Sequence, residues 1–393
     1  MTFFVFDLFI LLLLAVSSSP PPSIPAIPSI PTISLASLAT ASPSHIASLA
    51  ASLDEAFSTA GFVILTNVTV TSSSDSLVAA AREFFGRDHG EKMRHNYGEY
   101  GCEEGGFTPV GKEAVSKTVG GEEDGTVERT GKDMVENYVF RTMHGDDRDA
   151  DSHPERLYGE AKGYFGAMED LLRELNRLMA IAMSVEVDFF NDFFWPAAGA
   201  GARNGRNGNS LRIAHYPARG REGEGDACGA EGECGGEEGS VQERSVQERS
   251  VRYGAHTDYQ TFTILLQDPT DHRNGFGGLE VFAGGSWIPV VPPAPETVVA
   301  GTRTFVVNCG DLTEVWTAGR WKSVLHRVAN PTSEGGWNHE RVSVPFFTGP
   351  MEDVWVEPVG RGREEGEGGG RGRRYEAVNA KEHLMRKLGL STA

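Results

Sequence analysis

Basic residues are scarce in this sequence. Its 393 residues include 36 Lys and Arg against 55 Asp and Glu, so the formal net charge is −19. A nucleic-acid-binding protein needs a basic surface to neutralise phosphates. The acidic balance of this chain therefore argues against a nucleic-acid-binding protein. Acidic residues on solvated loops instead keep a protein soluble. We therefore predict no nucleic-acid partner.

Cysteine is scarce as well. The four cysteines, Cys102, Cys228, Cys234 and Cys309, are too few and too scattered for a disulfide scaffold. Cys228 and Cys234 lie in a Gly/Glu-rich segment without histidines, which argues against a metal site there. Reduced thiols in a cytosol-like compartment are the default for such a chain. We expect a cytoplasmic protein.

The N-terminus lacks basic residues and an apolar stretch long enough to span a membrane. The stretch from Phe3 to Val16 is apolar apart from Asp7, which suits a signal-peptide core and is too short for a bilayer. No Lys or Arg precedes Arg82, so the basic start of a signal peptide is missing. Residues 1–28 are a possible targeting segment and linker. The secretory pathway, an organelle or an incorrect start codon stay open as alternatives, and we predict no membrane contact for the mature domain.

Apolar residues are present in the amount that a core requires. Hydrophobic residues make up 39% of the chain, with 21 Phe and 6 Trp, which excludes a wholly disordered protein. An N-terminal region, residues 29–200, has the helical periodicity. Helices are predicted at 46–60, at 77–85 and, most clearly, at 154–183. The last has an apolar stripe at three- and four-residue steps, typical of core packing. Strands are predicted at 30–35, 62–65 and 136–141, and residues 98–132 are predicted to be mostly loop.

From residue 207 to 350 the pattern changes to short strands. They are bounded by Gly, Pro, Asn or Asp, as in an all-β sandwich or barrel. The predicted strands are 211–216, 262–266, 279–282, 286–291, 304–307, 323–328 and 341–347. Residues 219–250 and 360–374 are rich in Gly and charge, and we expect both to be flexible surface insertions. Residues 351–393 should form a C-terminal loop and helix.

One group of residues has the composition of a metal site. In His256-Thr257-Asp258, residues two apart project to the same face of a strand, so an imidazole and a carboxylate can reach a common point. His326 follows inside another apolar strand. Two histidines and one carboxylate form the facial triad of non-haem Fe(II) oxygenases. The alternative for a His-x-Asp pair alone is a partly exposed histidine beside a solvated aspartate.

A second polar pair follows on the strand 341–347. Arg341 and Ser343 share one face of this strand and alternate with the apolar Val342 and Val344. A buried guanidinium needs a partner, and a carboxylate matches its fork. The partner is either a ligand carboxylate or a protein carboxylate in an internal salt bridge, and the sequence leaves both open. Four aromatic residues of neighbouring strands could line a pocket or belong to the core. They are Tyr138, Phe140, Phe346 and Phe347.

Read together, these motifs resemble a known family, the isopenicillin N synthase-like 2-oxoglutarate/Fe(II) dioxygenases. The resemblance covers residues 30–390, in matching order and spacing except across the 219–250 insertion. The segments that carry it are Ile30–Ile33, Gly61–Leu65, Leu211–Pro217, Gly254–Tyr259, Gly278–Val281, Val307–Asp311, Val324–Val328 and Arg341–Ser343. The fold that it implies is mixed α and β: a double-stranded β-helix, or jelly roll, with an N-terminal helical region packed outside.

The resemblance also implies roles for single residues. His256, Asp258 and His326 would bind Fe(2+), and no catalytic residue is expected beyond this metal centre. Arg341, Ser343 and Tyr216 would bind the distal carboxylate of the co-substrate 2-oxoglutarate, with O2 as oxidant. The family often has Asn two residues before the tyrosine, whereas this chain has Ala214, so one contact to the co-substrate would be lost.

The implied activity is oxidation of a small organic metabolite, by hydroxylation, desaturation or ring closure, with release of succinate and CO2. Three alternatives remain. A related Fe(II) oxidase could bind a substrate carboxylate at Arg341 and Ser343 without using 2-oxoglutarate. A zinc hydrolase could use the same three ligands, although no Glu that could act as a base accompanies them. A binding module could have lost catalysis. The expected oligomeric state is a monomer.

Overall fold

The computed structural model describes the following parts of the chain: 29–36, 38–70, 74–96, 105–115, 132–141, 143, 152–195, 207–218, 252–268, 271–275, 277–291, 293, 299–332, 338–359 and 375–392. The possible targeting segment 1–28 and the predicted insertions 219–250 and 360–374 lie outside these residues, so the expectations for them stay predictions.

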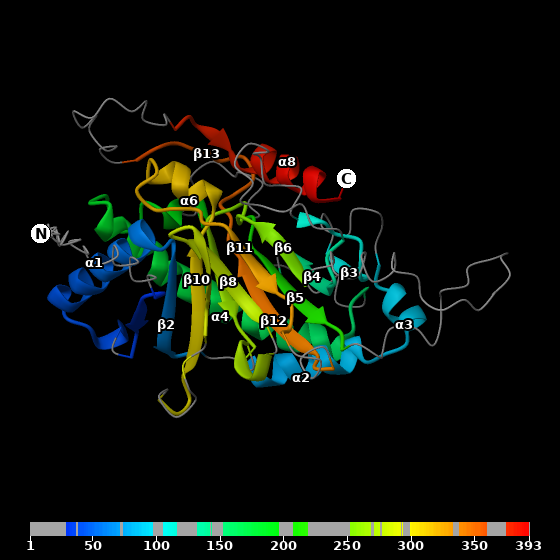
Figure 1. Ribbon diagram of the computed structural model, residues 1–393. Helices are drawn as coiled ribbons and strands as arrows, with labels where there is room; N and C mark the ends of the chain where they lie inside the picture. The colour runs from blue at the N-terminus through cyan, green and yellow to red at the C-terminus, as the bar shows by residue number, and fades with distance from the viewer. Residues whose placement is uncertain are drawn as a thin grey trace, which may run out of the picture.

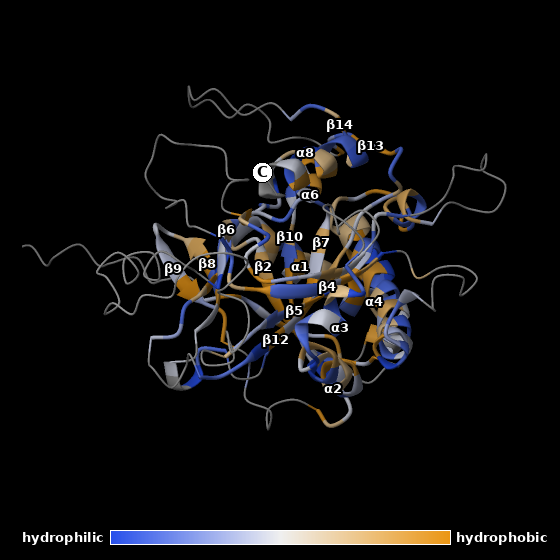
Figure 2. Cartoon of the chain, turned by 90° about the vertical axis from the view of Figure 1, so that its right-hand side faces the viewer, coloured by the Kyte–Doolittle hydropathy of each residue, from blue (hydrophilic) through white to orange (hydrophobic). Residues whose placement is uncertain are grey.

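Three helices of the N-terminal region contribute buried side chains to the main hydrophobic core. They are α1 (Pro43–Thr59), α2 (Ser74–Phe85) and α4 (Glu155–Ala182). Ser42 caps α1 by accepting a hydrogen bond from the His45 backbone N–H at 3.3 Å, and Pro43 follows at the position where a missing N–H costs little. The apolar stripe of α4 is buried, as its periodicity predicts. Figure 2 shows hydrophobic colour where α4 meets the strands.

A large sheet forms the centre of the molecule, with α4 behind it in Figure 1. Among the described residues it has eight strands. In spatial order they are β1 (Thr32–Ser34), β2 (Phe62–Val68), β10 (Arg303–Cys309), β7 (Phe262–Leu266), β12 (Arg341–Phe347), β5 (Ser210–Tyr216), β4 (Glu136–Arg141) and β3 (Gly106–Thr108). All pairings are antiparallel except β1 with β2.

A smaller sheet packs on the other face. Its spatial order is β6 (Tyr253–His256), β11 (His326–Ala329), β8 (Gly278–Ala283) and β9 (Ser286–Pro289). Leu279 and Val281 of β8 form one buried cluster with Ile64, Val306 and Leu265 of the large sheet, so apolar side chains fill part of the space between the sheets. Two facing sheets with helices outside are the predicted jelly roll, and this prediction is confirmed.

Strand alternation separates the two faces of the large sheet. Val342, Val344 and Phe346 of β12 belong to the core shared with α4, where Phe346 meets the ring of Phe165 at 4.9 Å between centroids. Arg341 and Ser343 alternate with them and therefore face the small sheet. Tyr138 and Phe140 also belong to the outer core. Of the four aromatic residues considered for a pocket, those three are core packing, and Phe347 is partly buried.

Several short elements differ from the sequence prediction. The segment predicted to be mostly loop, 98–132, contains the three-residue strand β3. The strand predicted at 323–328 runs instead from His326 to Ala329. Three further helices are α3 (His89–Met93), α6 (Asp311–Trp316) and the predicted C-terminal helix α8 (Ala380–Thr392); the remaining short elements are η1 (Leu38–Thr40), η4 (Asn191–Phe193), η5 (Arg273–Gly275), β13 (Trp355–Val356) and β14 (Val378–Asn379). In the described part of the chain, no helix is both long and apolar enough to span a bilayer.

Candidate metal centre and carboxylate site

Two histidines of the small sheet lie opposite each other. His256 is the last residue of β6 and His326 the first of β11, and the antiparallel pairing sets them side by side. Their ring centroids are 4.2 Å apart. Each Nδ1 lies within hydrogen-bond distance of a backbone carbonyl, Gly254 O at 2.8 Å and Val324 O at 3.1 Å, so each Nε2 points away from the backbone. A metal-binding histidine is usually oriented through its second nitrogen in this way.

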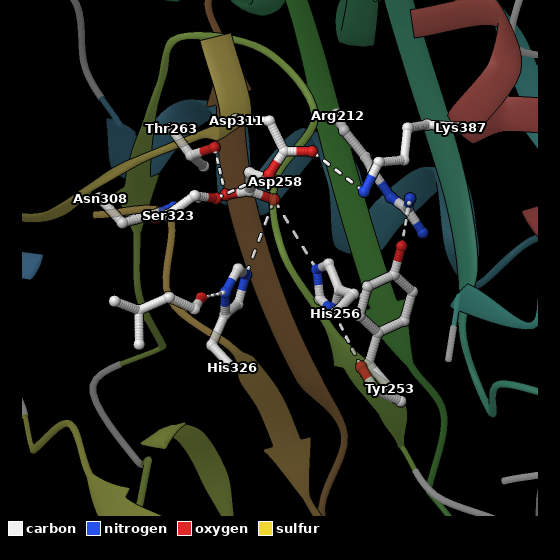
Figure 3. A network of polar contacts seen from close by, with 12 residues as sticks. Arg212, Tyr253, His256, Asp258, Thr263, Asn308, Asp311, Ser323, His326 and Lys387 are labelled. Carbon is white, nitrogen blue, oxygen red and sulfur yellow. Dashed lines mark hydrogen bonds and ion pairs between the residues drawn. The ribbon is translucent and has the colours of Figure 1, made fainter. Parts of the chain in front are cut away.

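Asp258 completes the group, and it does so from a loop. The strand-alternation argument for His256-Thr257-Asp258 is wrong in this respect, because β6 ends at His256 and Asp258 belongs to the turn that follows. The Asp258 carbonyl accepts a hydrogen bond from the Asp311 backbone N–H at 2.9 Å, which fixes the turn. Its Oδ1 lies 3.7 Å from Nε2 of His256 and 3.6 Å from Nε2 of His326. Figure 3 shows both imidazoles pointing at this carboxylate.

The other carboxylate oxygen of Asp258 is held by two donors. Oδ2 accepts hydrogen bonds from the Asn308 amide at 2.6 Å and from the Thr263 hydroxyl at 2.5 Å. Asn308 of β10 and Thr263 of β7 are direct cross-strand partners, so their side chains share one face and reach the same oxygen. Only Oδ1 is therefore directed towards the two histidines.

The three side chains are buried, and the pKa shifts of His256 and Asp258 give these two the protonation that a metal site needs. Burial and the neighbouring His326 lower the pKa of His256 to about 3, which keeps its imidazole neutral. Burial alone would raise the pKa of Asp258, but the two histidines and the hydrogen bonds from Asn308 and Thr263 bring it below its ordinary value. A neutral imidazole and an ionised carboxylate are the forms that bind metals.

This donor set fits a divalent iron. One atom from each of His256, Asp258 and His326 lies within 4.8 Å of the other two. Atoms about 2 Å from a common ion are roughly 3 to 4 Å apart, so the observed separations are close to those of ligands that share one metal. Two imidazoles and one carboxylate on one side of an ion leave its other positions open, as in oxygenases that bind Fe(II).

The predicted carboxylate-binding residues also meet. Arg341 of β12 is paired in register with Tyr216 of β5, and the guanidinium lies over the Tyr216 ring at 4.8 Å. Arg341 Nη1 donates to Ser343 Oγ at 3.0 Å. Burial raises the pKa of the Tyr216 phenol, and Arg341 and a hydrogen bond with Ser343 offset part of that rise. The structure thus brings the three residues together on the face that carries the metal group.

A protein carboxylate already contacts Arg341. Asp271, from the loop between β7 and β8, accepts from Arg341 Nε at 2.6 Å and from Nη2 at 2.8 Å. Both side chains are almost fully buried, with 2% and 1% of their surface exposed. The internal salt bridge that the sequence left open is therefore present. Binding of a ligand carboxylate by Arg341 stays a prediction, and it has to use another edge of the guanidinium.

A second buried ion pair, between Arg212 and Glu113, lies near His256. Arg212 of β5 donates to Glu113 at 2.8 Å and to the Tyr253 hydroxyl at 3.0 Å, and the Tyr253 ring lies 4.9 Å from the His256 ring. Glu113 also accepts from the Asn137 amide at 3.0 Å. Oδ1 of Asn137 is buried without a hydrogen-bond partner among the described residues. Figure 3 shows Arg212 and Tyr253 beside His256.

The C-terminal helix is tied to the loop of the metal group. Lys387 and His383 of α8 contact Asp311 at 3.0 and 3.1 Å. Burial would raise the pKa of Asp311, but these partners and Ser323 hold it well below its ordinary range. Because Asp311 also donates its backbone N–H to Asp258, α8 is connected to the candidate ligand through a single residue.

Sequence reasoning missed four residues that shape the site. Asn308 lies in a segment that carried the family resemblance, but no role was inferred for it. Thr263 could have been found by aligning the predicted strands 262–266 and 304–307, since opposing residues share a face. Asp271 and Glu113 lie in loops, and no periodic pattern in the sequence indicates that either acid is buried.

Comparison with known proteins agrees with this geometry. The model of the 2OG-Fe(II) oxygenase superfamily matches residues 238–350, and the N-terminal model of the non-haem dioxygenase in morphine synthesis matches residues 30–158. Together the two matches take in more than half of the chain. The chain belongs to the 2OG-Fe(II) oxygenase superfamily. The family predicted from the sequence motifs is thereby confirmed.

Individual relatives of this chain include fungal and plant proteins. The 2-oxoglutarate-dependent dioxygenase caaD of Aspergillus niger is 48% identical over 102 residues, or 25% of this chain and 26% of the relative. A rice homoarginine-6-hydroxylase is 30% identical over 233 residues, 58% of this chain and 54% of the relative. The chain thus matches about a quarter to a half of these relatives. The structure of a full-length Neurospora crassa protein in complex with alpha-KG superposes with a TM-score of 0.64, at 23% identity, over 92% of this chain and 95% of that one.

Proposed function

We propose that this oxygenase uses Fe(II), 2-oxoglutarate and O2 to oxidise a small organic molecule. The observation that carries the proposal is the convergence of one atom each from His256, Asp258 and His326 within 4.8 Å, with a neutral imidazole and an ionised carboxylate. These three residues would hold the iron. Arg341, Ser343 and Tyr216 would bind the distal carboxylate of 2-oxoglutarate. Bound iron would supply an oxidant able to break a C–H bond, with release of succinate and CO2.

The residues around the metal group have separate tasks in this proposal. Asn308 and Thr263 orient Asp258, so a single oxygen faces the ion. Arg341 and Ser343 hold the co-substrate on one side of the site. The cluster of Arg212, Glu113, Asn137 and Tyr253 lies beside His256, and there it would contact the substrate. Buried walls on both sheets would limit the access of water to the reacting group.

The charges of this second cluster favour a neutral polar group on the substrate. Glu113 neutralises Arg212, and burial raises the pKa of the nearby Asp133 to about 7. An additional carboxylate would therefore find no unpaired cation among the residues of this cluster. The Asn137 Oδ1 is an acceptor without a partner among the described residues, and it suits a hydroxyl or amide donor of the substrate.

The test is stoichiometric binding of Fe(II) together with succinate release from 2-oxoglutarate. Asp258→Ala should abolish stoichiometric iron binding and leave the fold largely intact, because a buried ionised group is removed together with the metal that pairs it. Circular dichroism serves as the folding control. An unchanged metal content in Asp258→Ala would remove this residue from the site, and absence of succinate with a broad metabolite extract would contradict the dioxygenase activity.

A second candidate function is an Fe(II) oxidase that does not use 2-oxoglutarate. The salt bridge between Arg341 and Asp271 favours this alternative, because Arg341 already has a carboxylate partner and need not bind 2-oxoglutarate. In that case a substrate carboxylate would bind beside Ser343. Substrate consumption without succinate would favour it over the dioxygenase. In either case we propose a cytoplasmic monomer that acts on a small molecule and has no nucleic-acid partner.

A further inference from the structure

The Arg341 guanidinium has one edge occupied and another available. Asp271 binds the side edge, formed by Nε and Nη2. Ser343 accepts from Nη1, and the Tyr216 ring covers one face of the guanidinium plane. Among the described residues, Asp271 and Ser343 are the acceptors of the guanidinium, so one N–H of Nη1 and one N–H of Nη2 have no acceptor there. A carboxylate can bind two N–H groups of such an edge in parallel.

The loop that carries Asp271 is built to place this carboxylate. His272, the next residue, has a φ of 58°, a conformation that residues with side chains adopt at a cost. Its backbone N–H donates to Gly277 O at 2.6 Å. At Gly278 a Cβ would lie 2.8 Å from the Cβ and Cγ of Asp271, so only glycine permits the close approach. The Asp268 carbonyl accepts from the Asp271 N–H at 3.1 Å.

We propose that Asp271 is the positioning residue of the co-substrate site. It fixes the side edge of Arg341, so that the end edge and the Ser343 hydroxyl receive the distal carboxylate of 2-oxoglutarate. The inference rests on the proposed use of 2-oxoglutarate. It differs from a purely structural salt bridge, and from a carboxylate that competes with the co-substrate for Arg341, because Asp271 and the ligand use different edges of one cation.

Because the charges around Arg341 balance, the affinity for a dicarboxylate depends on how the Arg341 guanidinium is oriented. A second buried guanidinium, Arg252, lies nearby; burial and repulsion from Arg341 lower its pKa to about 10, so it stays cationic at neutral pH. The two arginines and the carboxylates of Asp271 and Asp268 sum to a formal charge of zero. Attraction by net charge is therefore small, and the affinity for a dicarboxylate depends on hydrogen bonds that meet a correctly oriented edge.

Asp271→Asn tests this role, because the amide keeps the size of the side chain and turns a donor towards the guanidinium. The measurement is anaerobic titration of the Fe(II) protein with 2-oxoglutarate, followed by the metal-to-ligand charge-transfer absorption. A parallel titration uses pyruvate, which has the same oxo-acid group and no distal carboxylate. Glu280→Gln is the matched control: Glu280 pairs with Arg327 Nε and Nη2, both at 2.8 Å, on the small sheet.

We expect Asp271→Asn to raise the Kd for 2-oxoglutarate about tenfold or more, the scale of one hydrogen bond between charged groups. The Kd for pyruvate should change less than about twofold, and the control should bind both ligands as wild type does. An unchanged Kd for 2-oxoglutarate with a lower unfolding temperature of the metal-free protein would make the pair structural only. A tighter Kd would make Asp271 a competitor. Equal losses for both ligands would indicate general damage to the site. Each of these results overturns the proposal.

A second variant covers the case in which Asp271→Asn does not fold. Asp271→Glu keeps the buried charge paired but moves the carboxylate by about one bond length, and displacements of this order disturb binding geometry. We expect the same selective loss of 2-oxoglutarate affinity, and wild-type affinity in this variant would refute positioning. If wild type and the Glu280→Gln control also give no 2-oxoglutarate signal, the proposed function itself fails, and the role of Asp271 fails with it.

Discussion

Removal of the Asn308 amide should weaken iron binding although Asn308 is not a candidate ligand. In Asn308→Ala, Oδ2 of Asp258 keeps the Thr263 hydroxyl as its only donor among the described residues, so the carboxylate can rotate and its Oδ1 is less firmly directed at the two histidines. The lost contact is a 2.6 Å hydrogen bond to an ionised, buried acceptor. Such bonds contribute about 1.5–3 kcal/mol, and loss of an outer partner typically costs roughly 10- to 100-fold in metal affinity.

The assay is anaerobic titration of metal-free protein with Fe(II) in competition with a chelator of known affinity. The matched control is Asn209→Ala, which removes another buried amide, 2.8 Å from the carboxylate of Glu169 on α4. We expect the Fe(II) Kd of Asn308→Ala to rise by about 10- to 100-fold. The control should lose stability towards urea and keep the wild-type Kd. A change of less than about threefold in Asn308→Ala would refute the reasoning that outer hydrogen bonds direct Asp258.

Two further predictions concern parts of the chain outside the metal group. Asp133 has its pKa raised from 3.8 to about 7 by burial, so the unfolded chain loses this proton at lower pH than the folded one, and stability falls as pH rises from about 4 to 7. In urea titrations, the unfolding free energy of wild type relative to that of Asp133→Asn should fall by roughly 2 to 3 kcal/mol between about pH 5 and 8. A difference between the two proteins that does not change with pH would contradict this prediction. Replacing residues 220–249 with a short Gly/Ser linker should leave turnover within a few-fold, whereas loss of iron binding would show that the insertion belongs to the site.

The sequence predicts the fold well where a periodic pattern meets a buried face. The apolar stripe of α4 and the alternation of β5, β7, β10 and β12 are both of this kind, and their bounds differ from the prediction by a few residues at most. Short elements were missed because two or three residues carry no measurable period. β3 shows this: three residues in a Gly-rich stretch pair with β4 only because the sheet extends that far.

The candidate site was predicted in its composition and less well in its geometry. The sequence indicates His256, Asp258 and His326, but it places Asp258 on a strand, whereas the chain turns after His256. It indicates that Arg341 needs a carboxylate, but it cannot choose between a ligand and Asp271, because the acid lies 70 positions away in a loop. Contacts of this kind depend on the conformation of a loop. Neither the composition nor the hydrophobic periodicity of the sequence predicts that conformation.

The opposition of His256 and His326 across β6 and β11 links metal binding to strand alignment. β6 has four residues, and within the described chain it pairs only with β11, at the edge of the small sheet. A slip of one residue would turn one histidine to the other face of the sheet and separate the two Nε2 atoms. Only one alignment of these strands therefore offers both imidazoles to one ion. Bound iron would therefore stabilise the chain in which these two strands are correctly aligned, and it would not stabilise a chain in which they are misaligned.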